Sequence, residues 1–339
     1  MSLVKLPRIR LGLLPTPLHE LPNLSAFLAG QRLFAKRDDL TGLAMGGNKT
    51  RHLEFILPQV KQEGADVIIS TAGSQSNFCV QLAAAARRLN MNAVFIFFSG
   101  ATHPETQGNL LLQNILASEV RFLEGTRSSD NYQSNIARVL NEVADELREK
   151  GRKPVIINFV TKMSPYLPLA VSGYIEAVEE IWQQLLEQKI DAQYIVVSSD
   201  SGATYAGLLL GVKLLRLPIK IIGISAAESK DRLMSRIVDS ANLTAKFLGL
   251  DMAITPGDVE VYDDYLGEGY GIITRECEDA IRLVAQTEGI FLDPVYTGNA
   301  MAGLIDLIKK GRFKSTDTIV FIHTGGIPAL FAYDKEIAR

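Results

Sequence analysis

The stretch VVSSDSGATYAG, residues 196–207, decides the fold class. Two valines end an apolar run, a turn of small and hydroxyl-bearing residues follows, and the pattern then becomes helical. The stretch ISTAGSQSN, residues 69–77, repeats this order and leads into a helix predicted at 80–89. Strands that alternate with helices in this way are typical of a parallel sheet with helices on both faces.

The turns after these two strands are candidate ligand sites. Open α/β sheets bind anions where a strand end meets a helix start, because N–H groups are unpaired there and the helix dipole is positive. Residues 201–204 offer the N–H groups and hydroxyls that a phosphate needs, and residues 75–77 could hold a substrate carboxylate. The ordinary alternatives are a tight turn at the first site and a helix cap at the second.

The same alternation extends over most of the chain. Apolar residues recur every three or four positions in 136–147 and in 171–185, which predicts two long helices. Trp182 lies on the second stripe and is predicted to fill the core. Strands are predicted at residues 67–70, 93–98, 120–123, 155–160, 194–198, 220–225 and 318–322. The sequence therefore predicts an α/β protein with mostly parallel, twisted sheets.

Composition excludes several classes of protein. The 339 residues suggest about two domains. Lys and Arg number 35 against 38 Asp and Glu, a net charge of −3 that argues against nucleic-acid or membrane-surface partners. No apolar run approaches the roughly 20 residues of a membrane helix. Cys79 and Cys277 lie far apart, which favours a reducing cytoplasm over a disulfide framework or a thiolate zinc site. No metal-ligand spacing is present among His19, His52, His103 and His323.

A glycine-rich loop ends in a lysine at KRDDLTGLAMGGNKTR, residues 36–51. Gly42 and Gly47 have the spacing of the glycines in a GxxxxGK[ST] phosphate loop, but the extra Asn48 breaks that motif and no apolar strand immediately precedes it. A second interpretation is that Lys49 forms a Schiff base with pyridoxal phosphate, whose ring stabilises a carbanion. A third is a surface lysine at a helix start.

Two segments near the C-terminus carry further candidate groups, LDPVYTGN at 292–299 and IHTGGIPA at 322–329. Tyr296 could act as an acid or a base, and Thr297 or Thr324 could be a neutral hydrogen-bond partner of a ring nitrogen. The ordinary alternative is a buried tyrosine with its hydrogen bond satisfied.

These segments, in this order, resemble the pyridoxal-phosphate-dependent family that contains D-cysteine desulfhydrase and 1-aminocyclopropane-1-carboxylate deaminase. The resemblance covers nearly the whole chain, including LPTPL at 14–18, LPNLS at 21–25, residues 36–55 and PALFAY at 328–333. It implies a homodimer and the two-domain tryptophan synthase β-like fold. Residues 1–51 and 163–339 would form the large cofactor-binding domain, and residues 52–162 a small inserted domain.

The resemblance also implies roles for individual residues. The catalytic set is Lys49, Ser76 and Tyr296, with Lys49 as the lysine that binds the cofactor aldehyde. The cofactor-binding set is Lys49, Asn77, Ser201, Gly202, Ala203, Thr204, Thr297 and Thr324. In this set Asn77 would contact the phenolic oxygen of the cofactor, and Ser201 to Thr204 would cradle its phosphate. The substrate-binding set is Gln75, Ser76, Asn77, Tyr270 and Tyr296.

The choice of reaction rests on two threonines. Cyclopropane deaminases have a glutamate after the tyrosine, where this chain has Thr297, and usually a leucine where it has Thr324. A neutral hydroxyl strengthens the electron sink less than an acid does, which favours elimination of a good leaving group from a small amino acid. D-Cysteine desulfhydrase activity, giving pyruvate, sulfide and ammonia, is the reaction expected. The alternatives are 1-aminocyclopropane-1-carboxylate deaminase, L-cysteate sulfo-lyase, and a non-catalytic protein of the same fold that binds pyridoxal phosphate or an amino acid.

Four positions depart from the family pattern. His52 stands where a lysine is common three residues after the reactive lysine, which predicts weaker or pH-dependent phosphate binding. Phe78 replaces a histidine or glutamine, Val80 an arginine, and Asn299 a lysine. These changes bear on the substrate more than on the use of the cofactor.

Overall fold

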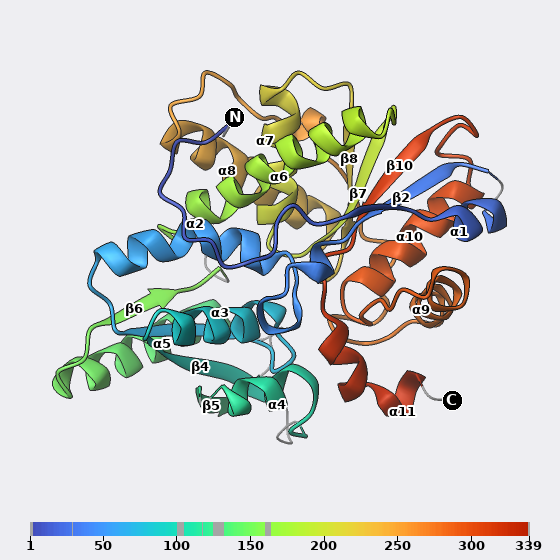
Figure 1. Cartoon of the computed structure of the whole chain (residues 1–339). Coiled ribbons are helices and arrows are strands. Elements are labelled where there is room, and N and C mark those ends of the chain that lie inside the picture. The colour runs from blue at the N-terminus through green and yellow to red at the C-terminus, as the bar shows by residue number, and fades with distance from the viewer. Residues whose placement is uncertain are drawn as a thin grey trace.

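The structure, a computed structural model, describes residues 3–28, 30–99, 105–116, 118–124, 132–159 and 164–337. Its strands form two sheets with helices packed on their faces (Figure 1). The larger sheet has the strand order β1-β2-β10-β7-β8-β9 and the smaller sheet the order β5-β4-β3-β6. Among the described strands, only β1 pairs in an antiparallel manner, with β2. The predicted α/β fold with mostly parallel sheets is confirmed.

The larger sheet separates two helical layers. Ile195 and Val197 belong to a core with α6, α7 and α8, and Val196 between them belongs to a core with α1, α9 and α10. This alternation follows from the two-residue period of a strand. The strands are β1 (Leu18–Glu20), β2 (Arg32–Lys36), β7 (Tyr194–Ser199), β8 (Lys220–Ser225), β9 (Glu260–Tyr262) and β10 (Thr318–Ile322). The helices are α1 (Pro22–Phe27), α6 (Leu167–Glu187), α7 (Ala203–Leu214), α8 (Lys230–Phe247), α9 (Arg275–Glu288), α10 (Thr297–Lys309) and the short α11 (Asp334–Ile337).

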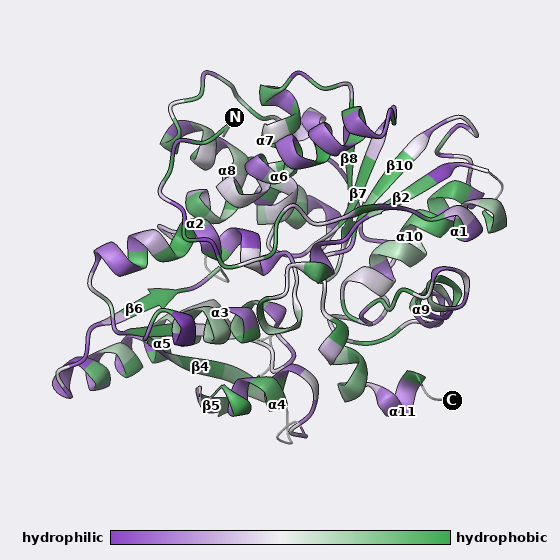
Figure 2. Cartoon of the chain, viewed as in Figure 1, coloured by the Kyte–Doolittle hydropathy of each residue, from purple (hydrophilic) through white to green (hydrophobic). Residues whose placement is uncertain are grey.

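The smaller sheet is built in the same way. Phe95 and Phe97 of β4 pack with α2, α3 and α4, whereas Val94 and Ile96 pack with α5. The strands are β3 (Val67–Ala72), β4 (Asn92–Ser99), β5 (Glu119–Glu124) and β6 (Pro154–Ile157). The helices are α2 (Lys49–Gln62), α3 (Asn77–Arg88), α4 (Gly108–Ile115) and α5 (Tyr132–Glu149). Most strands of both sheets have the hydrophobic colour in Figure 2. Within the described residues, no helix is both long and apolar enough to cross a membrane.

The seven predicted strands are all present. The predicted bounds of 220–225 and 318–322 are exact, and the other five strands differ at one or both ends. Val160, which was predicted to end β6, lies outside the described residues, as do His103 and the predicted domain boundary at 162–163. Three strands were missed, namely β1, β2 and β9. Strand β2 was missed because its last residue, Lys36, is fully buried in the structure, whereas a lysine in the sequence indicates an exposed position.

Lys36 is buried within an ionic cluster that joins distant parts of the chain. Its ammonium lies 2.5 Å from Oε1 of Glu180, and the Arg51 guanidinium lies 2.7 Å from the same oxygen. Arg51 also bonds both oxygens of Asp38, and the Tyr174 hydroxyl donates to Asp38 Oδ2. The cluster therefore ties β2, α2 and α6 together around the helix that carries Lys49.

Two glycines bring the start of α2 against the end of β10. Gly47 and Gly325 form an isolated antiparallel bridge. A Cβ added at Gly325, whose φ is +88°, would lie 2.6 Å from the Gly47 Cα. Only glycine at both positions allows the two backbones to approach so closely.

Candidate active site

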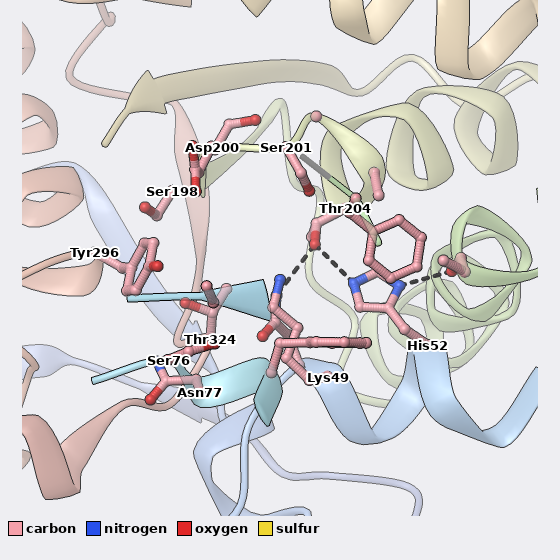
Figure 3. A pocket seen from close by; sticks show the side chains of 18 of the residues that line it. Lys49, His52, Ser76, Asn77, Ser198, Asp200, Ser201, Thr204, Tyr296 and Thr324 are labelled. Carbon is pink, nitrogen blue, oxygen red and sulfur yellow. Dashed lines mark hydrogen bonds between the residues drawn. The ribbon is translucent and has the colours of Figure 1, made fainter. Parts of the chain in front are cut away.

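A cavity of about 310 Å³ lies where the carboxyl ends of strands from both sheets meet. Figure 3 labels ten of its residues, including Lys49 and His52 from α2, Asn77 from α3 and Thr204 from α7. Ten of the twelve predicted site residues line this cavity, although they come from six separate segments of the chain. The two that do not are Gln75 and Thr297.

Lys49 is the first residue of α2 and is half-buried at the cavity wall. The preceding N–H of Asn48 donates to the Thr324 carbonyl at 3.0 Å, and the N–H of Thr50 donates to Gln81 Oε1 at 2.7 Å. Burial lowers the pKa of Lys49 to about 8, while the charge of Asp200 opposes that shift. The backbone on either side of Lys49 is therefore held in place, and a pKa of about 8 leaves a fraction of the amine unprotonated near neutral pH, as a nucleophile toward an aldehyde requires.

The turn between β7 and α7 forms a cradle for an anion. Gly202, with a φ of +81°, turns the chain so that the first N–H groups of α7 face the cavity, and a Cβ at this position would lie 3.1 Å from Ile237. The hydroxyls of Ser198 and Ser199 are buried there, and neither has a partner among the described residues. Unpaired hydroxyls beside a helix N-terminus fit a phosphate group.

Thr204 connects this cradle to α2. Its hydroxyl accepts a hydrogen bond from Asn48 Nδ2 at 3.1 Å and lies 3.1 Å from Nε2 of His52 (Figure 3). The other ring nitrogen of His52 lies 2.6 Å from the Ala170 carbonyl oxygen. His52 thus stands at the phosphate end of the cavity, at the position where the sequence departs from the family pattern.

The start of α3 supplies the candidate carboxylate site. Ser76 caps the helix by accepting from the Cys79 N–H at 3.2 Å, so the ordinary alternative of a helix cap is correct, and its side chain also lines the cavity. Asn109 Nδ2 donates to Asn77 Oδ1 at 2.7 Å, which leaves the Asn77 NH₂ group as the half that can donate to a ligand. The Gln75 side chain instead donates to the Gln107 carbonyl and accepts from the Asn109 N–H at the start of α4. It therefore holds this loop in place and does not line the cavity.

A tyrosine pair forms another wall of the cavity. The hydroxyls of Tyr270 and Tyr296 lie 2.6 Å apart, and a Cβ added at Gly73 would lie 3.6 Å from the Tyr270 ring. Asp293 fixes this wall from behind, because its fully buried carboxylate accepts from the N–H of Tyr296 at 2.9 Å and from the Thr297 hydroxyl at 2.6 Å. The Thr297 hydroxyl therefore points at Asp293.

Several functional residues were missed by the sequence analysis. Asn48 and Asn109 orient the groups that face the ligand, and Asp293 positions Tyr296. Arg236 lines the cavity and donates to the Phe159 carbonyl at 2.9 Å, which joins α8 to the end of β6. Asn109 and Arg236 belong to no recognisable motif, and the roles of Asn48 and Asp293, which lie within the segments 36–51 and 292–299, depend on contacts that the sequence alone does not show.

Fold and site together fit an α/β enzyme whose cavity binds a phosphorylated aldehyde, with Lys49 as the candidate residue for its attachment. Comparison with known proteins agrees: the family described as pyridoxal-phosphate dependent enzymes matches residues 9–325. D-cysteine desulfhydrase of Klebsiella pneumoniae is 39% identical over 99% of both chains. A candidate 1-aminocyclopropane-1-carboxylate deaminase of Pyrococcus furiosus is also 39% identical, over 99% of this chain and 96% of its own. The chain belongs to the pyridoxal-phosphate-dependent enzyme family.

Solved structures support the same conclusion. The crystal structure of a homologue of 1-aminocyclopropane-1-carboxylate deaminase superposes with a TM-score of 0.87 at 36% identity, covering 98% of this chain and 96% of its own. A hydrogen sulfide-producing enzyme of Fusobacterium nucleatum, with a TM-score of 0.62 and 18% identity over 91% and 94% of the two chains, shares the fold. Pyridoxal phosphate is the cofactor of this family. Lys49 and the anion cradle at the turn between β7 and α7 line the same cavity, and together they fit this cofactor.

Proposed function

We propose that the enzyme catalyses β-elimination from a small amino acid, with D-cysteine as substrate and pyruvate, sulfide and ammonia as products. The desulfhydrase relative supports this reaction. Pyridoxal phosphate, when bound, supplies a conjugated ring that withdraws electrons from the α-carbon of an attached amino acid. The residues of the chain must then place the substrate, hold the α-proton and assist the departure of sulfide.

Lys49 is suited to hold the α-proton. Its pKa of about 8 makes the amine a base that both accepts and returns a proton near neutral pH. The backbone at the start of α2 is fixed by Gln81 and by the contact at Asn48, which anchors the residue that carries the amine.

The start of α3 is suited to orient the substrate. The Ser76 side chain and the Asn77 NH₂ group both line the cavity, beside N–H groups at a positive helix end. A carboxylate bound there would fix the rotation about the α-carbon, and fixed orientation lowers the barrier to breaking one chosen bond.

The Tyr270–Tyr296 pair is suited to assist the leaving group. Two hydroxyls 2.6 Å apart share one hydrogen bond, which leaves the second phenolic proton to be donated elsewhere. Sulfide leaves more readily when it is protonated as the carbon–sulfur bond breaks.

The observation that carries the choice of reaction is the neutral group at position 297. Thr297 bears a neutral hydroxyl, which donates to Asp293 and accepts from the Asp293 N–H at 2.7 Å, so position 297 itself adds no acid beside the cavity. A weaker electron sink suits the expulsion of sulfide better than the opening of a cyclopropane ring.

The test is a screen of the enzyme for formation of 2-oxo acid, with D-cysteine, L-cysteine, L-cysteate and 1-aminocyclopropane-1-carboxylate as substrates. Sulfide and pyruvate from D-cysteine in equal amounts are expected. Lys49→Ala should lower this activity by about 10³-fold or more, and Lys61→Ala, an exposed change on the same helix, should not. If the cyclopropane substrate or L-cysteate is turned over faster than D-cysteine, the deaminase or the sulfo-lyase reaction replaces the proposal. If none of the four substrates is turned over, a non-catalytic binding protein is favoured.

We also propose that the enzyme is a cytoplasmic homodimer. Large apolar side chains remain exposed on this chain, among them Phe27, Phe247, Phe291 and Phe331, and such groups mark surfaces that bind a partner when they gather into a patch. The two cysteines are buried thiols, as a reducing compartment favours. Light scattering of the purified enzyme should give twice the mass of 37.2 kDa.

A further inference from the structure

The tautomer of His52 follows from its surroundings. The Ala170 carbonyl can only accept a hydrogen bond, so Nδ1 of His52 carries the hydrogen of the 2.6 Å contact. The proton state of Nε2 is the variable one, and this nitrogen faces Thr204 at 3.1 Å. In a neutral imidazole Nε2 accepts, so the Thr204 hydroxyl donates to His52 while it accepts from Asn48.

A phosphate in the cradle changes this arrangement. Thr204 lies in the first turn of α7, and its hydroxyl has one hydrogen, which it can give either to the phosphate or to His52. If it turns to the phosphate, a neutral Nε2 is left buried without a donor, because His52 is only 2% exposed. A proton on Nε2 removes the conflict. Thr204 then accepts from both Asn48 and His52 and donates to the phosphate, with no heavy atom displaced.

We propose that binding of the phosphate group in this cradle takes up one proton at Nε2 of His52, and that the Thr204 hydroxyl reverses its hydrogen bond from the imidazole to the phosphate. The proton comes from the buffer, and no covalent bond to carbon or phosphorus is made or broken. His52 thus supplies, only when the anion is present, the positive charge that a lysine at this position would carry at all times.

The charges around His52 set the direction of the effect. The pKa of His52 is lowered to about 3, chiefly by burial and also by the charges of Lys49 and Arg51, while the Ala170 carbonyl and Asp38 act in the opposite direction. The Tyr174 ring, 5.3 Å away on α6, belongs to a phenol whose own pKa is raised by burial. Arg236 and Asp200 line the same cavity. The empty site therefore holds a neutral imidazole from pH 6 to 8, and an anion in contact raises the pKa of His52.

Nitrogen NMR of the ¹⁵N-histidine-labelled full chain tests the proton directly. The chain has four histidines, so the His52 signals can be assigned with His52→Gln or, if that variant does not fold, with His52→Lys. We expect one protonated and one bare ring nitrogen in cofactor-free protein and with pyridoxal, which lacks the phosphate. With sulfate or with pyridoxal phosphate we expect both ring nitrogens to be protonated. An unchanged neutral imidazole in the presence of both anions would overturn the proposal.

Calorimetry of sulfate binding tests the coupling. Sulfate does not titrate near neutral pH, and at pH 6.5 Lys49 is already charged because its pKa is about 8. Titrations in two buffers of different ionisation enthalpy should show uptake of close to one proton. Affinity should fall by up to about tenfold per pH unit above the pKa of the anion-bound imidazole.

Variants show whether the proton that is taken up binds to His52 or to another group. His52→Lys should bind sulfate without proton uptake and with equal affinity at pH 6.5 and 7.5, and the exposed control His19→Gln should behave as the parent enzyme. Proton uptake that persists in His52→Lys, or its absence in the parent enzyme, would contradict the coupling. The result is independent of the reaction catalysed, because no arm measures turnover.

Discussion

At the scale of single residues, the pair formed by Asp293 and Thr297 decides what position 297 can hold. The Asp293 carboxylate is fully buried and accepts from the N–H groups of Val295, Tyr296 and Thr297 as well as from the Thr297 hydroxyl. Burial raises the pKa of this carboxyl, although its donors act in the opposite direction. A second acid at position 297 would therefore meet a buried acid that already occupies the site.

The variant Thr297→Glu tests this conflict. It should lower the free energy of unfolding by about 3 kcal/mol, because it places an uncompensated charge in a buried site. The double variant Asp293→Asn/Thr297→Glu should recover much of that loss in denaturant titrations, and Thr297→Ser should remain close to the parent enzyme.

The same double variant also tests the proposed reaction. If position 297 faces the ring nitrogen, release of sulfide from D-cysteine should slow while 2-oxo acid formation from the cyclopropane substrate rises. Equal changes in both rates would remove the argument that rests on Thr297.

At the scale of elements, the contact between α3 and α4 fixes the candidate substrate site. Asn109 Nδ2 bonds both the Asn77 side chain at 2.7 Å and the Gln75 carbonyl at 2.9 Å. The orientation of the Asn77 amide therefore depends on a helix that itself has no other part in the cavity.

Asn109→Ala should free that amide to rotate. The expected loss is about 1–3 kcal/mol of stability, because two buried oxygens lose their donor. The visible absorbance band of the bound cofactor should shift and turnover should fall. Asn114→Ala, an exposed change on the same helix, serves as the control. An unaltered spectrum together with unaltered turnover would show that Asn109 has only a packing role.

These cases show what the sequence could and could not predict. The strand-turn-helix segments were visible because their pattern is local, so Lys49 and residues 201–204 were assigned to one candidate site, and the structure brings them to the same cavity. The sequence did not predict which way the side chains of Gln75 and Thr297 point. Their hydrogen-bond partners, Asn109 and Asp293, turn them away from the cavity, and no sequence pattern identifies these contacts. Strand β2 was missed for a similar reason, since the partner that allows Lys36 to be buried, Glu180, is 144 residues away.

At the scale of the whole molecule, the ionic cluster around Arg51 joins the larger sheet to the helices beneath the cavity. Burial alone would raise the pKa of Asp38, but the charge and hydrogen bonds of Arg51 outweigh it and lower that pKa to about 2. A carboxyl with a depressed pKa stabilises the folded state above its unfolded pKa, and this contribution disappears as the pH falls.

Arg51→Met should therefore destabilise the protein in a pH-dependent way. At pH 7 the loss should be about 3–5 kcal/mol, because Asp38 is left buried without its partner. The difference from the parent enzyme should shrink between pH 4 and 2, as Asp38 becomes protonated. Unfolding by denaturant across this range measures it. Arg138→Met, which removes an exposed pair with Glu142, should cost at most about 0.5 kcal/mol. A loss for Arg51→Met that is independent of pH would contradict the assignment.

The bridge between Gly47 and Gly325 has a consequence for how such an enzyme can diversify. Because the backbones of Gly47 and Gly325 are in contact, there is no side chain between them that substitutions could enlarge or shrink. The distance between the segment that carries Lys49 and the end of β10 therefore stays fixed when other residues change. The walls formed by Phe78, Phe98, Phe159 and Tyr270 come from other segments and carry no such constraint. A lineage built on this chain can therefore exchange wall residues while the backbone on either side of position 49 keeps its place.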